Sequence, residues 1–370
     1  MKKMKVIVVS DVAPPWSVGG AERRIEQLRE GLRKFEVDFE IATMKWDEKN
    51  SSSYTFISPY LSIYKNGRRS ILSSVVFSLC TLRLITAKVD LIEVNQFPIL
   101  PIFPAWLIAK IKGVPLTATW HESWTLNDWS AYSPKYGYLM HQITRLSLKL
   151  PNKIVAASEL TYRELLNSGI RPNRVEIVEN EIDLGPDFVD DISNFGFDFL
   201  YVGRLIKHKN VDLVIRAWAQ LSATRSRVSL GIIGAGPELE SLKNLAESLG
   251  VGHSVSFLGH IESRAELMNL FRHSKIFVSA SSREGYGIAV AEAIALGLWT
   301  IVSDSPSNAS KALISSITGR VFKDGDENEL HQAMAGALED TVKPLPHLVP
   351  KLESQLAQGY MDIWTELVTS

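Results

Sequence analysis

The segment SREGYGIAVAEA, residues 282–293, places two glutamates, Glu284 and Glu292, in a glycine-rich and otherwise apolar run. A carboxylate is costly in a segment with the composition of a protein core, so each glutamate needs a partner or a ligand. Carboxylates accept hydrogen bonds well from neutral hydroxyls, which ribose and sugar rings offer in pairs. The other interpretation is structural: Glu284 caps a helix and Glu292 forms a surface salt bridge. For this segment alone, both interpretations remain open.

Glycines in the same segment predict a phosphate site. Gly285 and Gly287 permit a tight turn between a strand and an alanine-rich helix that runs to about Leu296. The start of such a helix presents free N–H groups and the positive end of the helix dipole, which suits an anion. If the helix starts at Tyr286, Glu292 lies roughly 9 Å further along its axis. The two carboxylates therefore need not have the same role.

A basic loop, GRLIKHKN at 203–210, follows the predicted strand FDFLYVG and contains Arg204 and Lys209. Arginine binds phosphate through two parallel hydrogen bonds and lysine adds a point charge, so the pair could hold a diphosphate without a metal. A solvated basic loop is the alternative. The position at the carboxyl end of a strand favours the phosphate site.

Short β-branched apolar runs alternate with segments of helical periodicity along most of the chain. This alternation predicts an α/β protein with two Rossmann-like, doubly wound domains in tandem and a ligand cleft between them, at the carboxyl ends of both sheets. The predicted parts are a first domain at 1–183, an acidic linker at 184–196, a second domain at 197–350, and a terminal helix at 351–370 that packs back on the first domain.

Composition excludes several other classes. The chain has 370 residues, is 45% hydrophobic and carries a formal net charge of −1, which disfavours a nucleic-acid partner. Its one cysteine, Cys80, excludes an internal disulfide. The N-terminus has too few apolar residues for a signal peptide, and no stretch has the length of a membrane span, so a cytoplasmic location is expected.

Taken together, these motifs resemble the GT-B-fold glycosyltransferases of family 4, retaining enzymes that use nucleoside-diphosphate sugars. The family frame E-G-[FY]-G-x4-E-A is matched by EGYGIAVAEA at 284–293. Supporting motifs occur in the family's order: VGG at 18–20, TWHE at 119–122, GRLIKHKN at 203–210, IIGAGPE at 232–238 and FLGHI at 257–261. The resemblance covers nearly the whole chain. It implies that the domain at 1–183 binds the acceptor and that the domain at 197–350 binds the nucleotide sugar.

The resemblance implies a role for each site residue. Arg204 and Lys209 would hold the diphosphate, Glu292 would bind the ribose, and Glu284 would bind the donor sugar near the reacting carbon. His121 would contact the donor sugar or the reacting centre. The implied backbone contacts are those of Gly19 and Gly20 with the diphosphate, of Gly287 and Ile288 with a phosphate, and of Gly259 to Ile261 beside the nucleobase.

The implied activity is transfer of a hexose from a nucleoside-diphosphate sugar, with UDP or GDP as the expected nucleotide, to a glycan, lipid-linked or small-molecule acceptor. It would serve polysaccharide or glycolipid biosynthesis and need neither a metal nor a cofactor. Two alternatives stay open. One is a GT-B sugar-nucleotide epimerase or hydrolase; the other is a catalytically silent protein that binds sugar nucleotides or glycans.

Two segments depart from the family pattern. Where the family often has GG-x-x-E, which binds the sugar, this chain has SDSPSNASKAL at 303–313. The frequent NG-x-D after the first domain is NEID at 180–183, with Glu181 in place of glycine. Recognition of the sugar by the first of these segments is therefore in question.

Residues of the first domain suggest acceptor and membrane contacts. The aromatic residues around His121 could pack in the core or stack on an acceptor sugar; they are Trp120, Trp124, Trp129 and Tyr132. Basic residues flank its apolar helices, namely Lys65, Arg68, Arg69, Lys135, Arg145 and Lys149. They form either a solvated helix face or a peripheral contact with anionic lipid, which would put the protein at the cytoplasmic face of a membrane.

Overall fold

The chain divides into two compact units. The computed structural model describes residues 3–14, 16, 19–46, 54–65, 68–185, 195–225, 227–339 and 355–369. Unit 1 comprises Met1–Glu181 and Glu353–Ser370, and unit 2 comprises Ile182–Leu352. The division after Glu181 falls two residues before the end of the first domain expected from the sequence. Most of the expected linker, 186–194, and the expected boundary at 350 lie outside the described residues.

Unit 1 contains a parallel sheet that has seven strands within the described residues, in the order β3-β2-β1-β6-β7-β8-β9. The strands are β1 (Met4–Val9), β2 (Val37–Met44), β3 (Tyr54–Ser58), β6 (Leu91–Asn95), β7 (Leu116–Trp120), β8 (Lys153–Ala156) and β9 (Val175–Ile177). A short antiparallel pair, β4 (Tyr64–Lys65) and β5 (Arg68–Arg69), stands apart from the sheet. Strands β6 and β7 are buried along their whole length, as expected for strands covered on both faces.

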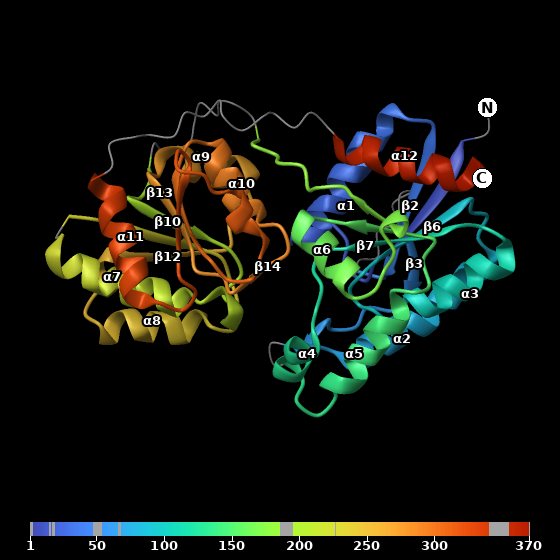
Figure 1. Ribbon diagram of the computed structural model, residues 1–370, viewed down its shortest axis with the longest axis horizontal. Coiled ribbons are helices and arrows are strands. Elements are labelled where there is room, and N and C mark those ends of the chain that lie inside the picture. The colour runs from blue at the N-terminus through green and yellow to red at the C-terminus, as the bar shows by residue number, and fades with distance from the viewer. Residues whose placement is uncertain are drawn as a thin grey trace. The chain divides into compact units, whose positions relative to one another are not determined.

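Helices cover both faces of this sheet (Figure 1). They are α1 (Gly20–Gly31), α2 (Ile71–Thr81), α3 (Ile102–Lys112), α4 (Leu126–Tyr132), α5 (Gly137–Ser147), α6 (Glu159–Asn167) and α12 (Gln355–Thr369). The last of these comes after all of unit 2 in the sequence, yet it lies beside α1 (Figure 1). Its Leu356, Tyr360 and Trp364 share a buried cluster with Val6 and Val155 of the sheet.

Unit 2 contains a second parallel sheet, with six strands among the described residues, in the order β12-β11-β10-β13-β15-β17. The strands are β10 (Phe199–Val202), β11 (Leu230–Ile233), β12 (Val255–Gly259), β13 (Ile276–Ser279), β15 (Trp299–Ser303) and β17 (Gly319–Phe322). The helices are α7 (Val211–Thr224), α8 (Leu239–Ser248), α9 (Arg264–His273), α10 (Ile288–Ala295) and α11 (Glu327–Glu339). A two-residue parallel pair, β14 (Arg283–Glu284) with β16 (Ser307–Asn308), lies outside the main sheet.

Each sheet has a point at which the strand order reverses. In unit 1, β1 pairs with β2 on one side and with β6 on the other. In unit 2, β10 pairs with β11 on one side and with β13 on the other. The loops that follow the two diverging strands leave a crevice at their carboxyl ends, which is where doubly wound sheets bind ligands. These loops therefore position the candidate residues.

Candidate donor and acceptor sites

The loops after β10 and β13 are joined by hydrogen bonds at the reversal point of unit 2. Asn210 takes a left-handed conformation with φ of 49° at the start of α7, and its side-chain amide donates to the Ala280 carbonyl at 3.1 Å. The backbone N–H of Ser282 donates to the His208 carbonyl at 2.9 Å. Burial, and next the charge of Lys209, lower the pKa of His208 to about 4. The basic loop is therefore fixed against the glycine-rich loop.

Lys209 forms an ion pair with Glu284 across these two loops. The two side chains are only 14% and 21% exposed, so little water screens the pair. Arg204 lies earlier in the same loop and is exposed, while its carbonyl accepts a hydrogen bond from the buried Tyr201 hydroxyl at 3.3 Å. Unit 2 thus presents a cation and a carboxylate together at the carboxyl end of its sheet.

Helix α10 begins at Ile288, two residues later than the sequence suggested, because Gly287 has φ of 94° and cannot belong to the helix. Its Cβ position would also lie 2.3 Å from the Ser310 Cβ, so only glycine fits there. No side chain caps the helix, which excludes the interpretation of Glu284 as an N-cap. The first N–H groups of α10 are therefore available to an anion.

Glu292 lies in the second turn of α10 and is 2% exposed. Its carboxylate accepts a hydrogen bond from the Arg264 guanidinium, the first residue of α9, at 2.7 Å. The same guanidinium also donates to the Asp183 carbonyl and lies 3.4 Å from the Asp183 carboxylate. The salt bridge of Glu292 is consequently buried, which corrects the surface interpretation.

The segment that replaces the family's GG-x-x-E is an ordered part of this site. Ser307 and Asn308 form strand β16 beside β14, the strand that contains Glu284. The fully buried Asn308 amide donates to the carbonyls of Ser281 and Ser303, at 3.2 and 2.9 Å. This segment supports the glycine-rich loop through its backbone and through Asn308, without a carboxylate.

Backbone conformation or close packing calls for glycine at two further positions. Gly259 ends β12 with φ of 70°, and Ile261 follows it as a half-buried residue of the core. A Cβ on Gly234 would lie 1.9 Å from the Gly203 carbonyl oxygen, so the GAGPE segment needs glycine to let two loops approach each other. The glycine at this position is therefore explained by packing between two loops.

His121 of unit 1 follows β7 and belongs to a chain of hydrogen bonds. Its Nε2 lies 2.6 Å from the Asn95 amide oxygen, and the Asn95 amide nitrogen donates to the Ser10 hydroxyl at 3.3 Å. Burial, and next the Arg24 charge, lower the pKa of His121 to about 3, so the ring is neutral at physiological pH. Since the Asn95 oxygen requires a proton on Nε2, Nδ1 is left as an acceptor.

Asp11 is a site residue that the sequence did not reveal. It follows β1, is 1% exposed, and accepts a hydrogen bond from Arg69 at 2.5 Å. Burial raises its pKa to about 6, although Arg69 opposes that shift. Its second oxygen has no hydrogen-bond partner in the described part of the chain. The signal in the sequence that could have identified Asp11 is its position after a strand at the reversal point of the sheet.

Gly20 is the first residue of α1, and Gly19 is its N-cap. Gly19 precedes the helix in an extended conformation, and a Cβ there would lie 2.7 Å from the Glu22 carboxylate.

The aromatic residues past His121 pack together, with the Trp124 and Trp129 rings 4.6 Å apart and the Trp124 and Tyr132 rings 5.2 Å apart. Mutual packing therefore accounts for these three rings.

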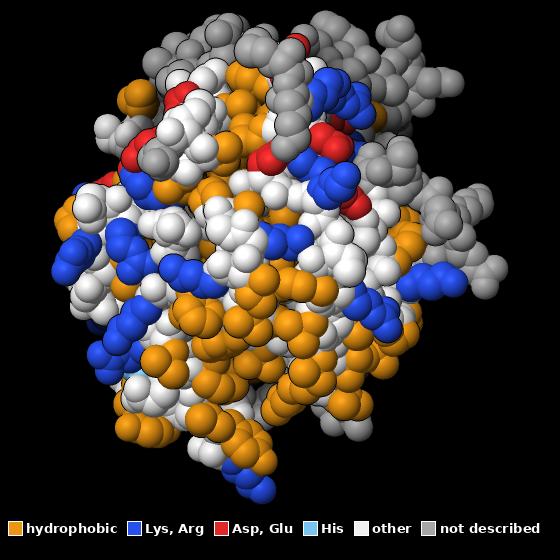
Figure 2. All heavy atoms as spheres, turned by 90° about the vertical axis from the view of Figure 1, so that its right-hand side faces the viewer, with side chains coloured by type: hydrophobic (Ala, Val, Ile, Leu, Met, Phe, Trp, Pro, Cys, Tyr) orange, Lys and Arg blue, Asp and Glu red, His pale blue; other side chains and the backbone are white. Residues whose placement is uncertain are grey.

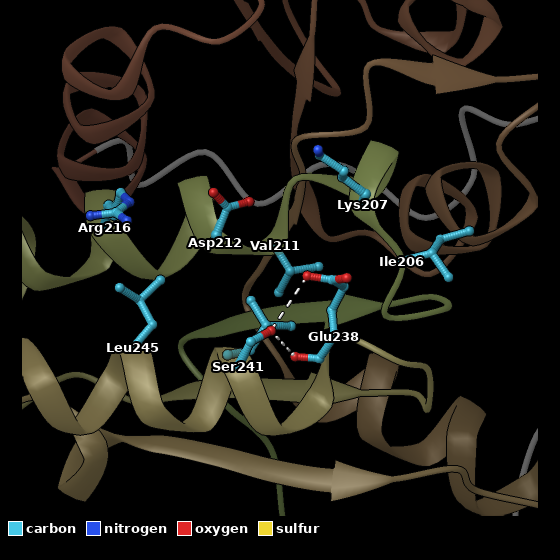
Figure 3. A pocket seen from close by; sticks show the side chains of 9 residues that line it. Ile206, Lys207, Val211, Asp212, Arg216, Glu238, Ser241 and Leu245 are labelled. Atoms are coloured by element: carbon cyan, nitrogen blue, oxygen red, sulfur yellow. Dashed lines mark hydrogen bonds between the residues drawn. The ribbon is translucent and has the colours of Figure 1, made fainter. Parts of the chain in front are cut away.

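A surface pocket of about 300 Å³ lies elsewhere on unit 2, between α7 and α8 (Figure 3). Lys207, Asp212, Arg216 and Glu238 line it, and none of the site residues expected from the sequence does. Its Ser241 hydroxyl bonds the carbonyl of Glu238 at 2.7 Å. The pocket thus shares Ile206 and Lys207 with the basic loop but contains neither Arg204 nor Lys209.

The structure distributes the expected residues between the units. Unit 2 holds Arg204, Lys209, Gly259, Ile261, Glu284, Gly287, Ile288 and Glu292, and unit 1 holds Gly19, Gly20 and His121. Within unit 2, Lys209 meets Glu284, whereas Glu292 is held by Arg264. No signal in the sequence links Arg264 to Glu292, because only the packing of α9 on α10 joins them. Among the described residues, no cluster of three or more His, Cys, Asp or Glu side chains could hold a metal ion.

Two family models match the chain, one on each half. The model of glycosyl transferases group 1 matches residues 192–351, and the model of glycosyltransferase family 4 matches residues 18–185. Together they leave out residues 1–17, 186–191 and 352–370.

Two curated relatives illustrate the similarity. The N-acetylgalactosamine-N,N'-diacetylbacillosaminyl-diphospho-undecaprenol 4-alpha-N-acetylgalactosaminyltransferase of Campylobacter jejuni is 30% identical over 53% of this chain. The match spans 52% of that relative, about half its length. The GDP-mannose:cellobiosyl-diphosphopolyprenol alpha-mannosyltransferase of Xanthomonas oryzae is 28% identical over 63% of this chain and 60% of its own length.

Solved structures share the fold at low identity. Sucrose-phosphate synthase from Thermosynechococcus elongatus superposes with a TM-score of 0.75 at 18% identity, over 99% of this chain and 95% of that one. Anabaena HepE, solved with UDP and glucose, superposes with a TM-score of 0.69 at 16% identity, over the same shares. The fold predicted from the sequence, a pair of Rossmann-like α/β domains of the GT-B type, is confirmed.

Proposed function

Because the chain belongs to the group 1 glycosyltransferases of family 4, we propose that it transfers a hexose from a nucleoside-diphosphate sugar to an acceptor hydroxyl, with retention of anomeric configuration. The observation that carries the proposal is the ion pair of Lys209 and Glu284 beside the N-terminus of α10. It combines a cation and free backbone N–H groups for a diphosphate with a carboxylate for sugar hydroxyls. The pair lies at the carboxyl end of the unit 2 sheet, where doubly wound sheets bind nucleotides, and this position supports the proposal.

The proposed donor site assigns a role to each charge. Lys209 and Arg204 neutralise the diphosphate, and the N–H groups of Gly287 and Ile288 bind one of its phosphates. Glu292 accepts hydrogen bonds from the ribose, held in place by Arg264 at 2.7 Å. Glu284 accepts hydrogen bonds from the sugar, and its carboxylate also pairs with Lys209.

The proposed reaction needs no protein nucleophile. The bond between the sugar C1 and the phosphate oxygen breaks, the electron pair stays on the diphosphate, and the sugar acquires oxocarbenium character. The acceptor oxygen attacks C1 on the face that the diphosphate leaves, and the departing phosphate takes the acceptor proton. Fixed cations and the helix N-terminus stabilise the charge that develops on the diphosphate, so no metal is required.

We propose a glycan or lipid-linked acceptor. The names of both relatives mention a lipid carrier, diphospho-undecaprenol in one and diphosphopolyprenol in the other. The neutral His121, with Nδ1 as acceptor, can take a hydrogen bond from a hydroxyl of the donor sugar. UDP and GDP are the nucleotides to test first, since UDP occupies one structural neighbour and GDP-mannose is named for one relative.

Nucleotide binding tests the donor site directly. UDP, GDP, ADP and NAD are each added to the protein in a thermal unfolding assay, because a ligand that binds the folded state raises its melting temperature. One nucleoside diphosphate should stabilise the parent protein, and Glu292→Gln and Arg264→Ala should lose that stabilisation. Arg272→Ala is the matched control, since Arg272 also lies on α9 and donates to the neighbouring Leu184 carbonyl, at 2.9 Å, but does not bind Glu292. Equal losses in all three variants would contradict the assignment of Glu292 and Arg264.

Turnover tests the reaction. Release of nucleoside diphosphate from the matching sugar nucleotide is measured with and without a polyprenyl-diphosphate-linked sugar, and in the presence of a chelator. A transferase depends on the acceptor, and its product keeps the anomeric configuration of the donor, which NMR determines. Turnover that does not depend on the acceptor would favour an epimerase or hydrolase. Binding of the sugar nucleotide without turnover would favour a silent binding protein. Loss of activity with the chelator would indicate a metal-dependent reaction.

A further inference from the structure

Helix α2 turns several large apolar side chains outward, although Phe77 is buried in the core. Ile71, Leu72 and Leu79 are 62%, 67% and 62% exposed, whereas Ser73 and Thr81 are buried. The Thr81 hydroxyl donates to the Phe77 carbonyl at 3.0 Å, and the Ser73 hydroxyl has no hydrogen-bond partner in the described part of the chain. A helix on the surface of a protein in water shows the opposite pattern, with its polar residues outside. The outer face of α2 is therefore suited to a non-aqueous surface.

Neighbouring helices extend this apolar face. Helix α3, which packs against α2, exposes Leu107 and Ile111 one turn apart, the latter 65% exposed. Helix α5 and the turn before it expose further apolar residues, which are Tyr136, Tyr138, Leu139 and Leu146. The lower part of the face shown in Figure 2 is a broad area of hydrophobic side chains, on the side where Figure 1 shows these helices. We call it the apolar face; exposed patches of this kind mark interaction sites.

Within the described part of the chain, the exposed charged side chains that accompany the apolar face are basic. Helices α2, α3 and α5 contain no aspartate or glutamate. Their exposed charged residues, and those next to them in sequence, include Arg83, Lys88, Lys110, Lys135, Arg145 and Lys149. Figure 2 shows Lys and Arg side chains around the orange area and no Asp or Glu side chain within it. Since the whole chain has a net charge of −1, this positive charge is local.

Three basic residues that the sequence grouped with this face need correction or exclusion. Arg69 is only 18% exposed and forms an ion pair with the buried Asp11, so its charge is not available to lipid. The side chains of Lys65 and Arg68 lie outside what the structure describes.

We infer that the apolar face docks on an anionic lipid bilayer, with its leucine, isoleucine and tyrosine side chains in the interface and its lysine and arginine side chains against lipid phosphates. Lysine and arginine can bury their stems in the apolar layer and keep their charges at the headgroups, and tyrosine favours the same depth. A symmetric pair of copies would instead bring the same cations of both copies together. Charge complementarity therefore selects the anionic bilayer over a second copy of the chain.

Docking brings the carboxyl-end loops of unit 1 near the membrane. The Tyr132 hydroxyl of α4 accepts a hydrogen bond from the Arg69 backbone at 2.7 Å, and Arg69 pairs with Asp11 at the reversal point of the sheet. Arg69 therefore links Tyr132, at the edge of the apolar face, to Asp11 in the loop after β1. That loop belongs to the unit that the proposed function expects to bind the acceptor. That the docked protein takes its acceptor from the bilayer rests on the proposed function; lipid binding itself does not.

Vesicle co-sedimentation of the full chain tests the inference without donor or acceptor. The vesicles contain phosphatidylcholine alone or with phosphatidylglycerol, at low and at high salt. The parent protein should bind the anionic vesicles and release in high salt, because each basic residue near the surface adds about fivefold to binding. Leu72→Ser with Leu79→Ser should weaken binding at least about tenfold, since each leucine loses its apolar contact. Arg145→Glu with Lys149→Glu should do the same.

Matched variants on unit 2 serve as controls. Leu249→Ser with Ile317→Ser removes exposed apolar residues, and Lys243→Glu with Lys323→Glu reverses exposed charges, and both should bind as the parent does. Melting temperatures show that each variant is folded. Absence of binding to anionic vesicles, or equal binding by all variants, would overturn the inference. A dimer that Leu72→Ser dissociates, without any vesicle binding, would replace it with self-association.

Discussion

Lys209 and Glu284 give the candidate donor site its own counter-ion. The Glu284 carboxylate pairs with Lys209, the cation that the proposed function assigns to the diphosphate. Under the proposed function, an incoming diphosphate competes with Glu284 for Lys209, and the sugar then binds the released carboxylate. The ion pair would thereby couple recognition of the two halves of the donor.

Glu284→Gln should separate these two effects. Removing the negative charge leaves Lys209 unpaired, so the nucleoside diphosphate alone should bind more tightly, by up to about tenfold, given the low exposure of the pair. Turnover of the sugar nucleotide should fall, because glutamine is a weaker acceptor for sugar hydroxyls. Calorimetric titration with the nucleotide and a rate measurement with the sugar nucleotide check both outcomes.

Lys209→Ala is the reference for this prediction. It should weaken nucleotide binding and turnover together, since it removes the cation itself. If Glu284→Gln also weakens binding of the nucleotide, the carboxylate does not compete with the diphosphate and the ion pair has a structural role.

Strands β6 and β7 and helix α12 meet at a buried carboxyl group. Glu93 of β6 is 2% exposed and accepts hydrogen bonds from the hydroxyls of Thr117 and Thr119, the latter at 2.7 Å. The Thr119 hydroxyl also contacts the Tyr360 hydroxyl of α12. Burial raises the pKa of Glu93 to about 7, although the threonine hydrogen bonds oppose the shift. The group connects three elements that are far apart in sequence.

Glu93 should make the stability of unit 1 depend on pH. Between pH values near 4.5 and 7 the folded state keeps a proton on Glu93 that the unfolded state has lost, so the free energy of unfolding falls as pH rises. His121 acts in the opposite direction below its ordinary pKa, so the variant is compared with the parent. The stability of Glu93→Gln relative to the parent should increase from about pH 5 to about pH 8, by up to about 3 kcal/mol, in denaturant titrations. A pH-independent difference would show that Glu93 titrates normally.

The sequence predicted most of the elements that position the site and few of the contacts within it. Strands β1, β6, β10 and β13 are continuous apolar runs, which fixes both reversal points. The edge strands β3 and β17 do not follow from the sequence, because both carry partly exposed residues and lack a continuous apolar run. Arg264 and Asp11 could not be assigned, since their partners lie at least 28 positions away in sequence and come together only through packing.

Unit 1 is completed by residues that follow unit 2 in the sequence, whereas unit 2 is one continuous stretch. Arg24 is 2% exposed and bonds the Val178 carbonyl at 2.5 Å, the Asn180 amide oxygen at 2.7 Å and the Tyr360 hydroxyl at 3.2 Å. One guanidinium thus joins the last residues of unit 1 before unit 2 to the helix after it. Loss of α12 contacts should therefore affect unit 1 selectively.

Trp364→Ala should destabilise unit 1 by about 3–5 kcal/mol, because the tryptophan is fully buried in α12. Hydrogen exchange in β1 and β8 should accelerate, while unit 2 keeps its protection and its response to UDP. Val368→Ala is the control on the same helix, since Val368 is 41% exposed, and should change little. Accelerated exchange throughout both units would mean that they unfold as one.

The position of α12 also sets an order for folding during synthesis. The cluster around Val6 and Val155 lacks Leu356, Tyr360 and Trp364 until those residues have left the ribosome, by which time all of unit 2 has been made. Unit 2 contains its whole sheet in one continuous stretch and can fold as soon as it emerges. The half of the protein that is translated first is therefore the half that completes its core last, and in the interval it presents an open apolar surface to chaperones.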